Sequence, residues 1–172
     1  MEIELERTFL AKYLPKDLDK FPSKQMQDNY LPKQARHPIL RIRKNGERFT
    51  MTKKYPKSQG DTSIMIEETI NLAQEEYNAL QQINSKIHKK IRYQYQTNIS
   101  KICEIDIYQD TLKGLVVIDF EFNNIEEKNN FIPPDFCLVE VTQEEFIAGG
   151  YLCGKSYEDI QEKLEKFGYK KL

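Results

Sequence analysis

The sequence has few cysteines, no long hydrophobic run and no excess of one sign of charge. Cys103, Cys137 and Cys153 are the three cysteines among 172 residues, and they lack the close pairing of a zinc site. This usage favours reduced thiols in a cytoplasmic protein over a disulfide framework. The sequence shows no signal peptide and no apolar run long enough to span a bilayer, so we expect no membrane partner.

Neither sign of charge dominates the composition. Lysine and arginine number 26, aspartate and glutamate number 27, and the formal net charge is −1. A general nucleic-acid binder would carry a basic excess, so we expect no stable nucleic-acid partner. Affinity for a polyanion must then come from a local arrangement of charges. The length suits one domain over residues 1–172 with room for a core, and we find no low-complexity tract or tandem repeat.

What the sequence does contain is like charges at alternate positions. Glu2, Glu4 and Glu6 would share one face of a strand, where they repel each other. A divalent cation such as Mg²⁺ would relieve that repulsion, because hard cations bind carboxylate oxygens. A solvated edge strand with a charged outer face is the alternative for this segment taken alone.

The same spacing recurs along the chain with both signs. Arg41 and Arg43 form one basic pair, and Lys90 and Arg92 form another. If the sheet closes, these faces point into one interior that holds both acids and bases. Such an interior suits a polyanion carried with a divalent metal, because Arg and Lys hold phosphate oxygens while carboxylates hold the bridging cations. The acidic pairs are Glu104 with Asp106 and Asp119 with Glu121.

The pattern predicts mainly β structure with few helices. Asn45-Gly46 is a hairpin signal, residues 73–83 have helical spacing, residues 124–130 suit a short helical connection, and Ser156 begins a capping-box pattern before a short amphipathic helix. An antiparallel sheet of about eight strands closes or packs face to face. Inward charge favours closure, so we expect a mainly β (α+β) fold, a closed eight-stranded antiparallel β-barrel with peripheral helices. The strands are predicted near 2–10, 25–31, 39–44, 47–55, 62–71, 86–96, 99–109, 113–123 and 136–143.

Several segments, in order, resemble the motifs of one family. Glu4-Leu5-Glu6-Arg7-Thr8 is similar to the Glu-x-Glu-x-Lys signature of the CYTH domain, the fold of the triphosphate tunnel metalloenzymes. The resemblance covers about residues 1–152, and the ordered set is more specific than any single motif. The other family-like segments are Gln27-Asp28-Asn29-Tyr30-Leu31, Leu40-Arg41-Ile42-Arg43, Phe49-Thr50-Met51-Thr52-Lys53-Lys54, Lys90-Ile91-Arg92-Tyr93, Glu104-Ile105-Asp106, Gly114-Leu115-Val116-Val117-Ile118-Asp119-Phe120-Glu121 and Glu140-Val141-Thr142.

The resemblance implies an eight-stranded tunnel that binds a small-molecule triphosphate with Mg²⁺ or Mn²⁺. Members of the family hydrolyse inorganic triphosphate, thiamine triphosphate or RNA 5′-triphosphate ends, or cyclise ATP. By position, the implied metal ligands are Glu4, Glu6 and Glu140, joined by the second acidic pair Asp119 and Glu121, and catalytic roles fall on Glu4, Glu6, Glu121 and Glu140. The implied phosphate ligands are Arg41, Arg43, Lys54, Lys90 and Arg92, which Asp106 would orient, with a similar role for Glu67.

Several positions depart from the family pattern. Ser63 and Met65 stand where the family often has Arg and an acid, and the Asn often seen after the Glu-Val-Thr motif is absent. Thr8 stands where the signature has lysine, and Arg7 does not replace it because position 7 points to the opposite face. These departures are compatible with a different substrate, lower activity or binding without turnover. A metal-dependent hydrolase of inorganic triphosphate is the leading interpretation. A class IV-type adenylate cyclase and a non-catalytic polyphosphate-binding or nucleotide-binding module are the alternatives, and either a monomer or a homodimer fits the sequence.

Overall fold

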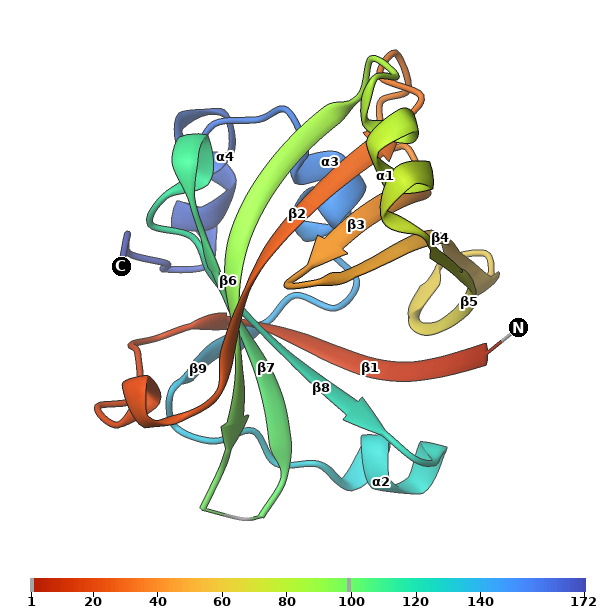
Figure 1. Ribbon diagram of the computed structural model, residues 1–172. Coiled ribbons are helices and arrows are strands. Elements are labelled where there is room, and N and C mark those ends of the chain that lie inside the picture. The colour runs from red at the N-terminus through yellow and green to blue at the C-terminus, as the bar shows by residue number, and fades with distance from the viewer. Residues whose placement is uncertain (1, 99) are drawn as a thin grey trace.

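Nine strands form one sheet, and eight of them close into a barrel. The computed structural model describes residues 2–98 and 100–172, and of Glu2 the backbone alone. The strand order is β5-β4-β3-β2-β6-β7-β8-β1-β9, and β1 also pairs with β5, which closes the antiparallel ring (Figure 1). The strands are β1 Glu2–Ala11, β2 Ser23–Leu31, β3 Leu40–Asn45, β4 Arg48–Ser58, β5 Asp61–Leu72, β6 Lys86–Gln96, β7 Ile102–Tyr108, β8 Val116–Phe122 and β9 Cys137–Glu140.

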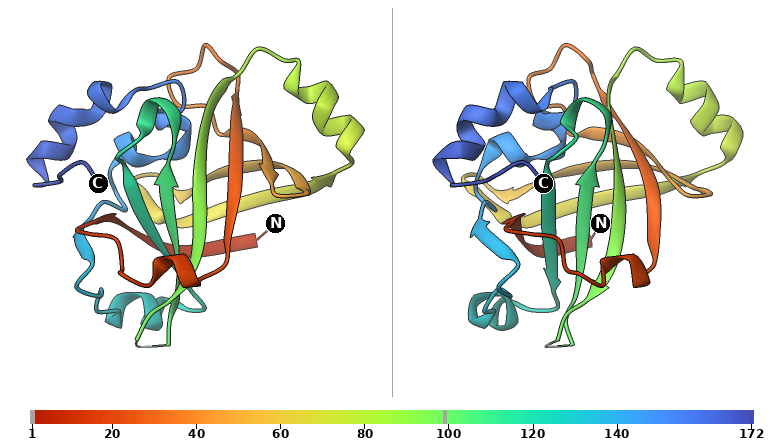
Figure 2. Two further views of the ribbon diagram at one scale, coloured as in Figure 1. Left: turned by 60° about the vertical axis from the view of Figure 1, so that its left-hand side comes forward. Right: turned by 90° about the vertical axis from the view of Figure 1, so that its left-hand side faces the viewer.

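The helices are short and lie around the barrel. In Figures 1 and 2, α2 lies on one side of β1, whereas α3 and α4 lie on the other. None of the helices in the described residues is long and apolar enough to cross a membrane. The α-helices are α1 Gln74–Gln81, α2 Ile125–Asn130, α3 Gly149–Leu152 and α4 Tyr157–Lys166, and the 3₁₀-helices are η1 Leu18–Lys20, η2 Asp110–Leu112 and η3 Glu145–Ile147.

The predicted mainly β barrel of eight antiparallel strands is confirmed. Gly46 adopts a φ of 61° in the hairpin between β3 and β4, as the Asn-Gly pair predicts. At the start of α4, the Ser156 side chain accepts a hydrogen bond from the Asp159 amide, and the Asp159 carboxylate accepts one from the Ser156 amide. The predicted capping box is therefore present.

Three predicted strand boundaries need comment. The strand predicted from residue 113 begins only at Val116, because Asp110–Leu112 forms a 3₁₀ turn and Gly114 has a φ of 101°. The strand predicted over 136–143 ends at Glu140 and is the ninth strand, outside the ring of eight. The predicted start at residue 99 lies outside the described residues, and β7 runs from Ile102.

β1 belongs both to the barrel and to an outer extension. Its first half pairs with β5, with Leu5 opposite Ile64. Its last residues pair with β9, with Phe9 opposite Glu140. Because β9 adds to β1 where β5 has already ended, β9 lies outside the closed ring.

The apolar core lies around the barrel and at one end of it. The outer faces of β1, β7 and β8 bury Phe9, Ile105 and Phe120 in one cluster. A second cluster joins Leu10 near the end of β1 to residues of η3, α3 and α4, including Leu152. The C-terminal segment therefore closes this end of the barrel and leaves the interior to polar side chains.

Candidate functional site

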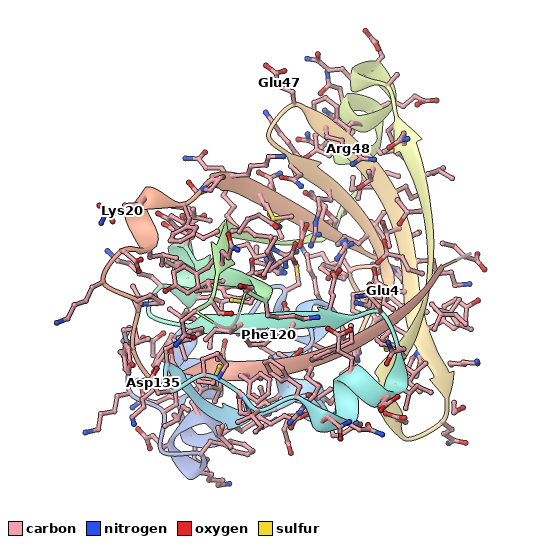
Figure 3. The ribbon with its side chains drawn as sticks, turned by 90° about the horizontal axis from the view of Figure 1, so that it is seen from below. Glu4, Lys20, Glu47, Arg48, Phe120 and Asp135 are labelled. Carbon is pink, nitrogen blue, oxygen red and sulfur yellow. The ribbon has the colours of Figure 1, made fainter. Side chains whose placement is uncertain are left out.

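Strand alternation directs the acidic side chains of β1 inward. Phe9 belongs to the outer cluster, so the alternate positions Glu4, Glu6 and Thr8 face the interior. Glu4 lies beside β4 and β5 in Figure 3. Lys54 of β4 bridges the two carboxylates, with its Nζ 2.7 Å from Glu4 Oε2 and 2.9 Å from Glu6 Oε2. Burial would lower the pKa of Lys54, but Glu6 and Glu4 raise it above its usual range and keep the ammonium charged.

A second group of ion pairs joins β6 to β7. Arg92 donates from Nε and Nη2 to the Asp106 carboxylate at 2.7 and 2.6 Å, and also pairs with Glu104. Lys90 Nζ donates to the same Asp106 carboxylate. Asp106 is only 1% exposed; burial would raise its pKa, but Arg92 and Lys90 hold that pKa well below its usual range. Asp106 thus orients the two cations.

A third pair joins β2 to β3. Arg43 donates from Nε and Nη2 to the two oxygens of Asp28 at 2.6 and 2.7 Å, a bidentate geometry. Burial opposes ionisation of Asp28, but Arg43 keeps its pKa well below the usual range. The Arg41 side chain on the same strand has a buried Nε that finds no hydrogen-bond partner within the described part of the chain. Arg41 is therefore the less satisfied of the two arginines.

Two further inward acids, Asp119 and Glu121, come from β8. Thr8 donates its hydroxyl to Asp119 Oδ1 at 2.7 Å, so it has a polar partner, although it cannot supply the charge of the lysine that the family signature has there. Burial, Asp106 and Glu6 raise the pKa of Asp119 to about 7. Burial, Glu104, Glu4 and Glu6 likewise raise the pKa of Glu121. The raised pKa values reflect burial first and crowded negative charge on the inner face second.

Burial also raises the pKa of Glu4, and its carboxylate neighbours Glu67 and Glu6 add to that shift against the opposing effect of Lys54. A cation between these carboxylates would stabilise their ionised forms. This repulsion between carboxylates is concentrated where β1 lies between β5 and β8.

The donor chemistry of this inner face fits Mg²⁺ or Mn²⁺. The side chains are carboxylates, the oxygen ligands that hard cations prefer, and their mutual repulsion is the cost that a cation would relieve. Within residues 2–98 and 100–172, however, no three His, Cys, Asp or Glu side chains are already gathered closely enough to hold a metal ion. The ammonium of Lys54 instead holds the two β1 carboxylates together. The carboxylates of suitable chemistry are Glu4, Glu6, Asp119 and Glu121.

Glu140 is not placed with this set, contrary to the sequence-based expectation. Arg7 donates to Glu140 from Nε at 3.1 Å and from Nη2 at 2.5 Å, and Thr142 donates its hydroxyl to Glu140 Oε1 at 2.7 Å. Glu140 is opposite Phe9 in the β1–β9 pair, and facing residues share one side of a sheet. Because Phe9 points outward, Glu140 points outward too. The structure therefore separates it from Glu4 and Glu6.

Two interior residues were not assigned a role from the sequence. Asp28 lies within a family-like segment, but only the register that places it opposite Arg43 on one side and His88 on the other shows its partners. His88 looked isolated in the sequence, yet it shares the inner face of β6 with Lys90 two residues later. That spacing is the signal that could have found His88. For Glu2, whose side chain was expected to join the acidic face, the structure describes only the backbone.

Comparison with known proteins shows the fold. No protein-family model matches the chain, and no curated protein matches it. The solved structure of the inorganic triphosphatase NE1496 is 24% identical with a TM-score of 0.65, covering 90% of this chain and 97% of the other. A second structure of NE1496, named there a hypothetical protein, is also 24% identical with a TM-score of 0.65, covering 89% and 99%.

A candidate adenylate cyclase from Bacillus halodurans is 18% identical with a TM-score of 0.54, covering 99% of this chain and 92% of the other. The similarity thus extends over almost all of each chain. The barrel described above is therefore the fold of these proteins, and the chemistry of this chain must be argued from its own interior.

Proposed function

We propose that this protein is a Mg²⁺- or Mn²⁺-dependent hydrolase of a small triphosphate, with inorganic triphosphate as the substrate, and that it belongs with the CYTH-domain triphosphate tunnel metalloenzymes. One observation carries the proposal: a closed barrel whose interior sets basic side chains from three strands against carboxylates from β1, β7 and β8. The structural neighbour NE1496, named an inorganic triphosphatase, supports this choice of substrate. The basic side chains are Arg41, Arg43, Lys54, Lys90 and Arg92.

An interior filled with ion pairs can exchange partners with an ionic ligand. Lys54, Arg43 and Arg92 are each neutralised by carboxylates. A triphosphate offers these cations phosphate oxygens, while a divalent cation arriving with it offers the carboxylates a new partner. Each buried charge thus exchanges one opposite partner for another, so neither set of buried charges is left unpaired. A triphosphate without a metal would leave the carboxylates without a new partner, so we expect it to bind more weakly than the metal complex, and we expect turnover only with both ligands.

The residues divide into two roles. The metal would be held by Glu4, Glu6, Asp119 and Glu121, and when bound it would neutralise part of the phosphate charge. Arg43, Lys90 and Arg92 hold phosphate oxygens and stabilise the charge that develops on them during transfer. The raised pKa of Glu121 suits a carboxylate that orients the attacking water and accepts its proton. Closure of the barrel by η3 and α3 keeps bulk water from the deep end.

The test is phosphate release from inorganic triphosphate, thiamine triphosphate and ATP, each with Mg²⁺, with Mn²⁺ or with EDTA. We expect release from inorganic triphosphate that depends on metal and is fastest among the three. ATP reactions are also checked for cyclic AMP, whose formation would favour the cyclase instead. Thermal stabilisation by triphosphate without release of phosphate would favour a binding module. The proposal would be contradicted if triphosphate caused no phosphate release and no thermal stabilisation.

A further inference from the structure

His88 is a buried residue of the barrel interior to which the proposed chemistry gives no part. Its side chain is 3% exposed, and within the described part of the chain neither ring nitrogen has a hydrogen-bond partner. The ring lies between Tyr30 and Tyr108, with ring centroids 5.8 and 5.3 Å away. Leaving both nitrogens of a buried imidazole unpaired is costly, and such groups usually have a partner in some state of the protein.

The end of the interior at His88 is closed by α3. A methyl group on Gly149 would overlap the hydroxyl of Tyr30 and would lie 3.6 Å from His88 Nε2, so the backbone of α3 is seated against both rings. Cys153, just after α3, places its Sγ 3.9 Å from the Asp28 carbonyl oxygen. Nothing larger than a glycine fits at position 149 without moving Tyr30. Ligands must therefore approach His88 from the barrel side.

Every strand around His88 contributes charged or titratable groups. The nearest is Asp28 of β2, whose Oδ2 lies 3.9 Å from His88 Nε2. Burial lowers the pKa of His88 to about 4; Lys90 and Arg43 add to that shift, whereas Asp28 and Asp106 oppose it. The groups around the ring are Asp28 and Tyr30 of β2, Arg43 of β3, Lys90 of β6, and Asp106 and Tyr108 of β7. Beyond them, Arg41 interacts with Tyr30, and Cys153 with Asp28.

Entry of a phosphate chain changes that balance. Arg43 and Lys90 are the two cations that oppose protonation of His88, and both are proposed phosphate ligands. Phosphate oxygens beside them offset their charge, while Asp28 stays within reach of Nε2. Asp28 would also share Arg43 with the phosphate and would then need a further donor, since it is 1% exposed and wholly dependent on protein partners.

We propose that His88 is a positioning residue of the triphosphate site that takes up one proton from solvent when phosphate reaches Arg43 and Lys90, and then donates from Nε2 to Asp28. The imidazolium replaces the hydrogen bonds that Asp28 gives up and adds one positive charge at the closed end. This inference rests on the proposed function, because it requires a triphosphate in the interior. It makes affinity for triphosphate increase as the pH falls, by up to about tenfold per pH unit over the range where His88 titrates.

The first test follows the ring signals of histidine by NMR, which is simple because the chain contains only His37 and His88. The probe is sodium tripolyphosphate in EDTA, so that no turnover intervenes. Without it, we expect the His88 signal to stay in its neutral position down to about pH 5. With it, we expect the His88 midpoint to rise by about 2 pH units. If the midpoint of the His88 signal does not change when tripolyphosphate binds, the inference is overturned.

The second test counts protons by calorimetry at pH 5.5, with tripolyphosphate titrated in two buffers of different ionisation enthalpy. H37Q is the matched control and should take up as many protons as the wild type. H88Q should take up fewer, by about half a proton or more. Equal proton counts for all three proteins, with binding intact, would refute the role of His88 and leave the proposed function standing. Absence of any binding, in EDTA and with Mg²⁺ alike, would refute both, and the NMR test needs no variant should H88Q fail to fold.

Discussion

Lys54 Nζ lies 2.7 Å from Glu4 Oε2, in the place where a divalent cation would serve the same carboxylate. The ammonium also reaches Glu6, so one side chain neutralises the acidic pair that β1 presents to the interior. The barrel therefore has its own cation when no ligand is present. Metal binding must compete with Lys54 until a triphosphate binds and the ammonium pairs with its phosphate oxygens instead.

The first prediction concerns this competition. K54Q should bind Mn²⁺ about tenfold more tightly than the wild type when no triphosphate is present, because Glu4 and Glu6 lose their internal cation. The same variant should bind tripolyphosphate more weakly. Electron paramagnetic resonance of free Mn²⁺ measures the first effect. K53Q is the matched control. It removes the same charge, and Lys53 is the exposed neighbour on the other face of β4. Equal Mn²⁺ affinities for K54Q and K53Q would contradict the competition.

The second prediction concerns Arg43 and Asp28. R43A should lower the free energy of unfolding by about 3 kcal/mol, because it strands a buried carboxylate. It should also weaken binding of tripolyphosphate. Urea denaturation measures the loss, and R48A serves as a control because Arg48 is exposed and donates to exposed Asn71 outside the interior.

The double variant D28N/R43A separates the two effects. It should recover much of the stability lost in R43A, because the stranded charge is gone, but it should not recover phosphate binding. Recovery of phosphate binding by D28N/R43A would show that Arg43 affects binding only through its pair with Asp28.

The third prediction concerns pH. The pKa of Asp119 is raised from 3.8 to about 7, so the folded protein keeps a proton that the unfolded chain has released. Stability from that protonated carboxyl is present below about pH 4 and is lost as the pH rises to about 7. D119N carries no such cost. The unfolding free energy of D119N relative to the wild type should therefore grow by about 2–3 kcal/mol between pH 5 and pH 8. A constant difference across thermal or urea melts would show that Asp119 is ionised throughout.

The fourth prediction separates Glu140 from the inner acids. E140Q should keep most of the activity, because its carboxylate pairs with Arg7 on the outer side of β1. The pair is partly exposed, so the loss of stability should be less than about 1 kcal/mol. Rates of phosphate release for E140Q, compared with the wild type under the same metal concentration, check this. Loss of activity in E140Q with an unchanged melting temperature would return Glu140 to the metal site.

The barrel was predictable because its cause is local. Alternating charges such as Glu4 and Glu6, or Arg41 and Arg43, would be costly on an open apolar sheet, and turn residues such as Gly46 mark the connections. The inward direction of most site residues followed from the same alternation.

The pairings inside the barrel were not predictable in this way. They depend on the register between strands far apart in sequence, which a single chain does not display. Asp28 meets Arg43 and His88 only because β2 lies between β3 and β6. Glu140 was misplaced for a related reason. Its charge and spacing match the inner acids, but β9 adds to β1 beyond the end of β5, where the facing residue Phe9 points outward.

The most direct measurement is the rate of Mg²⁺-dependent phosphate release from inorganic triphosphate by E6Q and by E68Q. Glu6 is an inner carboxylate held by Lys54, whereas Glu68 is exposed on β5, and each variant removes one negative charge without changing side-chain volume. We predict that E6Q loses at least about a hundredfold in rate while E68Q stays close to the wild type. Equal rates for E6Q, E68Q and the wild type would show that the chemistry does not take place at the inner carboxylates of this barrel.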